Sequence, residues 1–118
     1  MVDTNMQKFT HDNANNFTDM SKNHVLLRDR LYPEKASNWS LKGHALYDLE
    51  KYEEAIEAFD RAIELDPKDA FNWNFKGNAL YDLEKYEEAI KAFDKAIELD
   101  PEDAINWNLK GHALYDLE

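Results

Sequence analysis

The amino-acid sequence predicts an all-α fold, an α-solenoid of stacked antiparallel helical hairpins. Three observations support this prediction. The apolar residues follow a helical period, and residues 38–71 and 72–105 are identical at 27 of 34 positions. In addition, every tryptophan, glycine and proline of the chain recurs at a spacing of 34 residues: Trp39, Trp73 and Trp107; Gly43, Gly77 and Gly111; Pro33, Pro67 and Pro101. A fixed period of this size indicates one supersecondary unit copied in tandem.

The period predicts how the chain is organised. Residues 1–17 are asparagine-rich and aperiodic, which predicts a disordered N-terminal arm. Residues 18–35 align with the second half of a preceding unit but lack its small alanines, so we expect a decayed half-repeat that acts as a capping helix. The array itself is predicted over 36–118, as repeat 1 at 36–69, repeat 2 at 70–103 and the first helix of a truncated repeat 3 at 104–118.

Each unit contains two helical patterns. In repeat 2 the first is expected at about Ala70–Leu83, with Asp69 placed to cap its amino end. The second is expected at about Glu87–Leu99. Two acidic residues stand in its first turn, where the positive end of the helix dipole favours negative charge. Pro101 cannot continue that helix and marks its exit. A short turn at 84–86 joins the two, which predicts an antiparallel hairpin.

Composition excludes several classes of function. The net charge of −11 lies entirely in residues 38–118, which hold 20 acidic and nine basic residues. A nucleic-acid partner requires a basic surface, so neither nucleic acid nor an anionic membrane is expected as a partner. The acidic residues are read either as a solvated outer face or as a surface for a basic partner. Without cysteine, a signal segment or an apolar run of membrane length, a cytoplasmic protein is expected.

The repeated motif resembles that of the tetratricopeptide repeat. Its positions in repeat 2 are Trp73, Gly77, Tyr86, Ala89, Phe93, Ala96 and Pro101, and in repeat 1 they are Trp39, Gly43, Tyr52, Ala55, Phe59, Ala62 and Pro67. The resemblance implies a right-handed superhelix whose first helices line a concave face. It also implies a non-catalytic scaffold that binds a peptide segment of a partner protein on that face.

A helical wheel selects the residues of that face. They combine aromatic and aliphatic side chains with amides and a column of aspartates, a mixture typical of interaction surfaces. The predicted partner-binding residues are Ser40, Leu41, His44, Tyr47, Asp48, Phe71, Asn74, Phe75, Asn78, Tyr81, Asp82, Asn108, His112, Tyr115 and Asp116. For Leu41, Phe71 and Phe75, packing between neighbouring repeats remains an equal alternative.

One subset of the resembled family binds the acidic tails of heat-shock chaperones through a carboxylate clamp of lysine, asparagine and arginine. Asn78 fits an amide position of that clamp, but His44 and His112 do not. The other clamp positions hold Ser40, Asn74 and Asn108, and Leu41, Phe75 and Leu109. Because aspartates lie nearby, we expect no clamp and instead a peptide with apolar anchors and some basic character.

No enzyme, cofactor or metal site is expected. The sequence shows no nucleophile–base pair and no phosphate-binding glycine loop. His44 and His112 lie two repeats apart, beyond shared reach of one ion. The acidic loops before and after Pro67 and Pro101 lack the glycine and terminal glutamate of a calcium loop.

The third unit suggests an alternative function. Its sequence ends at Glu118, before the residues that form the second helix of the earlier copies. Trp107, Leu114 and Leu117 therefore lack the helix that would cover them, which favours self-association or exchange of helices between chains. The alternative reading is thus a self-assembling structural module, against the simpler reading of a frayed last helix on a monomer.

Overall fold

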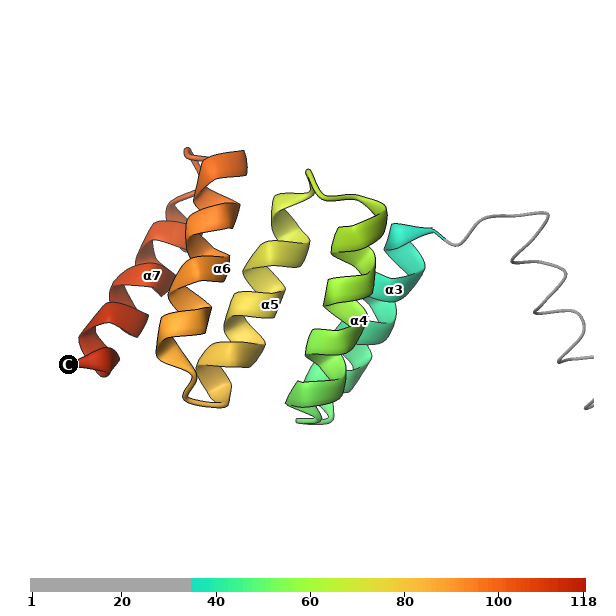
Figure 1. Ribbon diagram of the computed structural model, residues 1–118, viewed down its shortest axis with the longest axis horizontal. Helices are drawn as coiled ribbons and strands as arrows, with labels where there is room; N and C mark the ends of the chain where they lie inside the picture. The colour runs from blue at the N-terminus through green and yellow to red at the C-terminus, as the bar shows by residue number, and fades with distance from the viewer. Residues whose placement is uncertain (1–34) are drawn as a thin grey trace, which may run out of the picture. The chain divides into compact units, whose positions relative to one another are not determined.

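The computed structural model describes residues 35–118. Within this range the chain forms helices and no strand, which confirms the all-α prediction. Figure 1 shows the helices side by side in chain order: α3 (Ala36–Asp48), α4 (Tyr52–Leu65), α5 (Ala70–Asp82), α6 (Tyr86–Leu99) and α7 (Ala104–Leu117). The predicted arm at 1–17 and the predicted capping helix at 18–35 lie outside the described residues, apart from Lys35.

The helices begin where the sequence places cap chemistry. The carboxylate of Asp69 accepts a hydrogen bond from the backbone N–H of Phe71 at 3.0 Å, which confirms the predicted cap of α5. Asp103 makes the same 3.0 Å bond with Ile105 at the start of α7. Helix α6 begins at Tyr86, one residue before the predicted start, and its first turn holds the two expected glutamates.

Helices α3 and α5 end in the same tight turn. Helix α5 closes at Asp82, one residue short of the predicted end, and Glu84 follows with a left-handed φ of 62°. The N–H of Lys85 donates to the carbonyl of Leu80 at 2.9 Å, and that of Glu84 donates to the carbonyl of Tyr81 at 2.8 Å. This is a Schellman motif, in which glycine is the usual left-handed residue. It reverses the chain within a few residues and so makes each unit a hairpin.

Each hairpin is closed by a glycine and a phenylalanine. Phe59 of α4 and Phe93 of α6 are fully buried. A Cβ atom on Gly43 would lie 2.6 Å from the ring of Phe59, and one on Gly77 would lie 2.5 Å from the ring of Phe93. Only glycine permits this approach. The alanines of α4 and α6 complete the core: Ala55, Ala58, Ala62, Ala89, Ala92 and Ala96.

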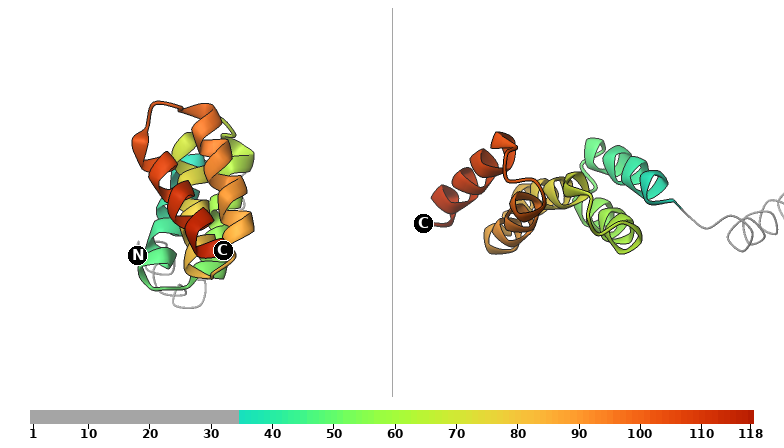
Figure 2. Two further views of the ribbon diagram at one scale, coloured as in Figure 1. Left: turned by 90° about the vertical axis from the view of Figure 1, so that its left-hand side faces the viewer. Right: turned by 90° about the horizontal axis from the view of Figure 1, so that it is seen from above.

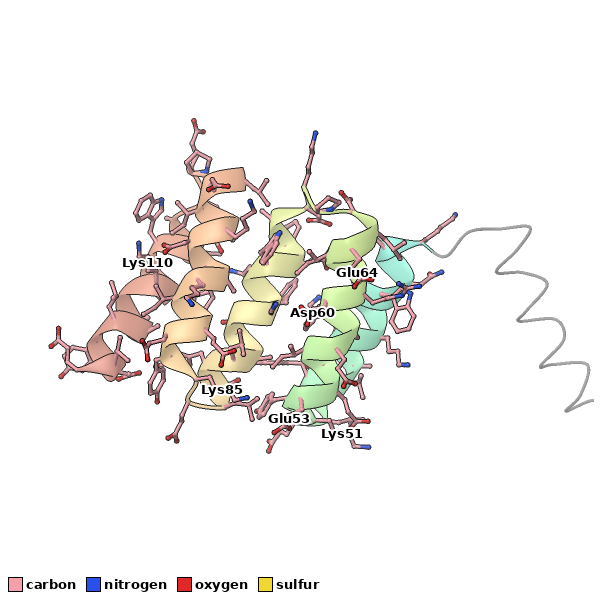
Figure 3. All side chains as sticks on the ribbon, in the orientation of Figure 1. Lys51, Glu53, Asp60, Glu64, Lys85 and Lys110 are labelled. Carbon is pink, nitrogen blue, oxygen red and sulfur yellow. The ribbon has the colours of Figure 1, made fainter. Side chains whose placement is uncertain are left out.

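Successive hairpins are joined by packing and by ion pairs. Helix α4 packs against α3 of its own unit and against α5 of the next, and α6 likewise packs against α5 and α7. Lys76 of α5 pairs with Asp60 of α4 at 2.7 Å, and Lys110 of α7 pairs with Asp94 of α6 at 2.7 Å. Asp60 and Lys110 are labelled in Figure 3. The lysine that precedes the glycine of the motif therefore links two units.

The helices alternate between two sides. Seen from above in Figure 2, α3, α5 and α7 lie on one side of a zigzag and α4 and α6 lie on the other. We call the exposed side of α3, α5 and α7 that faces away from α4 and α6 the inner face. Among residues 35–118, no helix is long and apolar enough to cross a membrane.

Candidate functional site

The inner face exposes large apolar side chains. Leu41 of α3, Phe71 of α5 and Ile105 of α7 are each between 60% and 68% exposed. Ile105 holds the position in its unit that Phe71 holds in repeat 2. For Phe71 the structure therefore favours surface exposure over packing between repeats, whereas the unit that precedes Leu41 lies outside the described residues. A row of exposed apolar residues on one face is typical of an interaction site.

Phe75, in contrast, packs between neighbouring repeats. Its ring lies 4.0 Å from the ring of His44, centroid to centroid, and 5.7 Å from that of Phe59. Phe71 stacks beside it at 6.1 Å. Phe75 and His44 are thus half-buried and fill the junction between α3 and α5, so most of their surface contacts neighbouring side chains.

Amides join the first helices of successive units. Asn74 of α5 donates from Nδ2 to Oδ1 of Asn106 of α7 at 2.5 Å. Ser40 makes the equivalent bond to Asn72. Within α5, Asn78 donates from Nδ2 to Oδ1 of Asn74 at 3.2 Å. Asn74 is only 8% exposed. The wheel placed Asn74 on the open face, but its side chain is held between α5 and α7 and its amide is already engaged.

Tyrosines and aspartates form a second set of links. The hydroxyl of Tyr47 donates to a carboxylate oxygen of Asp82, and that of Tyr81 donates to one of Asp116. Burial first, and then the bond to Asp82, raise the pKa of Tyr47. The bond to Asp116 first, and then burial, raise the pKa of Tyr81 to about 12. The sequence assigned these four side chains to a partner, whereas here they bridge consecutive units.

Four other predicted residues of the inner face lie open. Asp48 on α3 is exposed, as are Asn108, His112 and Tyr115 on α7. Asn78 is half-buried. Among residues 35–118, no group of three histidine, cysteine, aspartate or glutamate side chains is arranged to hold a metal ion.

A cavity of about 280 Å³ opens between α5 and α7. Its wall is formed by side chains of both helices and of the loop between α6 and α7: Phe71, Asn74, Phe75, Asn78, Asp100, Asp103, Ile105 and Asn106. Four of these eight residues, Phe71, Asn74, Phe75 and Asn78, belong to the predicted partner-binding set, and the other four do not. Asn106 holds the same position in its unit as Asn72, and this recurrence could have indicated that both side chains are buried.

Helix α7 carries a second apolar surface. Leu114 is 44% exposed, whereas its counterpart Leu80 is 5% exposed beneath α6. A Cβ atom on Gly111 would meet nothing within 4 Å, unlike one on Gly43 or Gly77. Trp107 is 51% exposed, and Leu117 is also exposed. No described residue covers this side of α7.

Two protein-family models match the chain. The model of the anaphase-promoting complex, cyclosome, subunit 3 matches residues 18–96, and a model of the TPR repeat matches residues 77–117. The first covers more than half of the chain, and both agree with the 34-residue motif and its helical hairpins. The chain belongs to the tetratricopeptide-repeat (TPR) family, and its fold is the all-α solenoid of that family.

Solved structures of TPR domains resemble the described helices. The second TPR of Spaghetti (RPAP3), bound to the HSP90 peptide SRMEEVD, is 31% identical with a TM-score of 0.69, over 71% of this chain and 78% of that one. The TPR2B domain of yeast Sti1, in complex with pHsp70, is 28% identical with a TM-score of 0.68, over 70% and 66%. The first TPR of Spaghetti, with the same HSP90 peptide, is 24% identical with a TM-score of 0.70, over 71% and 67%, and shows the fold alone.

No curated protein matches the chain in a sequence comparison. The structural relatives were solved with peptides of heat-shock proteins, so they support a protein or peptide as partner. They give no support to the expectation that a carboxylate clamp is absent.

Proposed function

We propose that this chain is a non-catalytic protein-interaction scaffold that holds a peptide segment of a partner on its inner face. The observation that carries the proposal is the exposure of one large apolar side chain on each of three successive first helices, Leu41, Phe71 and Ile105. Burying one such side chain contributes about 1.5–3 kcal/mol. The TPR relatives that were solved with bound peptides support the same class of partner.

Charge favours a peptide with basic as well as apolar residues. The array carries the whole net charge of −11, and Asp48, Asp82 and Asp116 lie along the inner face. Asp82 and Asp116 accept hydrogen bonds from tyrosines, which leaves their negative charge in place. An acidic peptide would meet like charges, whereas a basic one would be attracted during encounter.

We propose further that no carboxylate clamp operates here. A clamp needs cationic or amide donors free to reach a carboxylate. Two of the three positions that would supply them carry Ser40, whose hydroxyl bonds Asn72, and Asn74, whose amide bonds Asn106. The third carries Asn108, which is exposed on α7 and, within residues 35–118, is the one amide of this set without such a bond. The adjacent positions hold Leu41, Phe75 and Leu109, which donate no hydrogen bond from their side chains. Lys76 and Lys110 are engaged with Asp60 and Asp94.

Fluorescence anisotropy with two labelled heptapeptides tests this function. One is SRMEEVD, and the other is SRMKKVK, which reverses its charge. We expect the basic peptide to bind more tightly and its affinity to fall about tenfold in Leu41→Ala/Phe71→Ala, because two apolar contacts are lost. Leu49→Ala is the matched control, since Leu49 is as exposed but lies in the turn after α3. Tighter binding of SRMEEVD would contradict the absence of a clamp.

A second candidate function, self-association, is favoured by the uncovered side of α7. The counterparts of Trp107 and Leu114 on α3 and α5 are buried or half-buried beside a second helix, whereas α7 presents both side chains exposed around Gly111. We propose that two chains associate through Trp107, Leu114 and Leu117. The apolar character of these side chains supplies the driving force.

Light scattering on a sizing column at two concentrations tests association. The chain should show a mass above 13.9 kDa that rises with concentration, and Leu114→Lys/Leu117→Lys should return it to a monomer. Leu41→Lys, which places a similar charge on an exposed leucine of α3, should leave the mass unchanged. A monomer at both concentrations would rule this candidate out.

A further inference from the structure

The cavity between α5 and α7 lies at a junction whose side chains differ from those between α3 and α5. At the junction of α3 and α5, His44 and Phe75 meet with ring centroids 4.0 Å apart. Asn78 and Leu109 hold the same two positions at the junction of α5 and α7. Asparagine and leucine occupy less space than two aromatic rings. Asn78 lines the cavity of about 280 Å³, and Leu109 packs partly buried against the core. The two junctions of the array are therefore chemically distinct.

The wall of this cavity combines apolar side chains with polar ones. Phe71, Phe75 and Ile105 supply aromatic and aliphatic surface. Asn74 and Asn78 supply polar groups, and Asn74 is anchored by Asn106. A pocket of this size with a few placed polar groups suits one apolar side chain of a peptide.

The rim of the cavity is negatively charged. Asp100 and Asp103 belong to the loop before α7, and both line the opening. Asp103 accepts from the backbone of Ile105. Asp100 forms no side-chain hydrogen bond or ion pair with any residue of the described range. A cation at this rim would gain two carboxylate neighbours, whereas a carboxylate would be repelled.

We propose that this cavity is the anchor site of the inner face and takes a leucine-sized apolar side chain that is followed by lysine or arginine. The inference rests on the proposed peptide-binding function and adds to it a position and a sequence preference. The apolar side chain enters between Phe71 and Ile105, and the cationic residue lies against Asp100 and Asp103. Since the α3–α5 junction is filled by His44 and Phe75, the array holds its ligand in one register.

Nine-residue labelled peptides test the anchor. They share glycine and serine flanks and differ only in a central Leu-Lys-Lys, Leu-Glu-Glu or Ala-Lys-Lys. We expect the Leu-Lys-Lys peptide to bind about tenfold more tightly than either of the others. The Ala-Lys-Lys peptide loses one buried leucine, and the Leu-Glu-Glu peptide reverses two charges. Anisotropy on the full chain measures all three affinities.

Two variants with matched controls locate the site. Asn78→His/Leu109→Phe fills the cavity with the pair that the chain already uses between α3 and α5, so the helices should form normally by circular dichroism. It should weaken the Leu-Lys-Lys peptide about tenfold. Asp100→Asn/Asp103→Asn should weaken it about threefold, because exposed charge pairs contribute little each. Asp66→Asn/Asp69→Asn, the same change one unit earlier, should leave it unchanged.

The outcomes separate the two proposals. If the peptides bind and Leu41→Ala/Phe71→Ala weakens them, but the cavity and rim variants do not, the anchor is wrong and the inner face still binds peptides. If the Leu-Glu-Glu peptide binds best, the cationic preference is wrong. If none of the peptides binds, both the anchor and the peptide-binding function are overturned.

Discussion

Glu50 and Glu84 end their helices in a conformation that suits glycine better. Their φ angles are 61° and 62°, in the left-handed region. A residue with a Cβ atom is strained there by about 1–2 kcal/mol relative to its usual conformations. The turns persist because two backbone hydrogen bonds hold each of them.

Glu84→Gly is therefore expected to stabilise the protein, by about 0.5–1 kcal/mol. Relief of strain outweighs the extra freedom that glycine gives the unfolded chain. The midpoint of urea unfolding measures the change, with Glu87→Gly in the first turn of α6 as the control that should destabilise. A lower midpoint for Glu84→Gly would show that the left-handed turn carries little strain.

The same change from glycine to alanine is expected to have opposite effects at Gly77 and at Gly111. Gly77→Ala places a methyl group 2.5 Å from the buried ring of Phe93, and such overpacking costs about 1–3 kcal/mol. Gly111→Ala meets nothing within 4 Å and gains the helix propensity of alanine, worth up to about 1 kcal/mol.

Thermal unfolding of these two variants compares identical changes in nearly identical sequences. We expect the melting temperature to fall for Gly77→Ala and to rise for Gly111→Ala. Equal shifts in the same direction would mean that packing against the second helix does not determine the need for glycine.

The bounds of the helices can be predicted largely from local sequence, but the contacts between successive hairpins cannot. The bounds of α5 and α6 could be predicted to within one residue, because caps, turns and helical periodicity act over a few residues. The bonds from Tyr47 to Asp82 and from Asn74 to Asn106 could not. They depend on how far one hairpin is shifted along the next, a quantity that no local pattern encodes.

Part of the candidate site could likewise be predicted from the sequence, and part could not. The helical wheel identified the side of α3, α5 and α7 on which exposed residues gather. It could not separate Phe71, which is exposed, from Phe75, which packs on His44. The difference depends on the neighbouring unit, where His44 of α3 contacts the ring of Phe75.

The tyrosine–aspartate links between elements should make stability fall at high pH. Tyr81 has a pKa of about 12 in the folded chain, against about 10 for tyrosine in an unfolded one. Its contribution is fully present below pH 10. Above that, the unfolded chain loses the proton first, so the free energy of unfolding decreases until the folded pKa is passed.

Urea midpoints at pH 8, 10 and 11.5 measure this effect. The decline above pH 10 should be smaller in Tyr81→Phe, which removes the titrating hydroxyl and keeps the ring. Tyr115→Phe serves as the control, because Tyr115 is highly exposed. The same decline in Tyr81→Phe as in the parent chain would assign the loss to other groups.

At the scale of the whole molecule, nearly identical helices have unequal surroundings. Helix α5 lies between α4 and α6, whereas α7 packs against α6 alone among the second helices that the structure describes. Amide hydrogen exchange in the monomer should therefore be at least about tenfold faster in α7 than at the same positions of α5. Mass spectrometry distinguishes the segments, since Asn78 differs from His112. Equal rates would indicate that α7 is covered in solution.

The links between units also constrain how such a chain changes length. Every inter-unit bond joins neighbouring repeats at a constant offset: 32 residues for Asn74 with Asn106, 35 for Tyr81 with Asp116 and 16 for Asp94 with Lys110. Deleting or duplicating a whole period of 34 residues re-forms each bond with an equivalent partner. A change of 33 or 35 residues would misalign all of them at once. Recombination within such a gene can therefore shorten or lengthen the array only in steps of one period, and each step would alter the number of binding positions while every junction keeps its polar pairs.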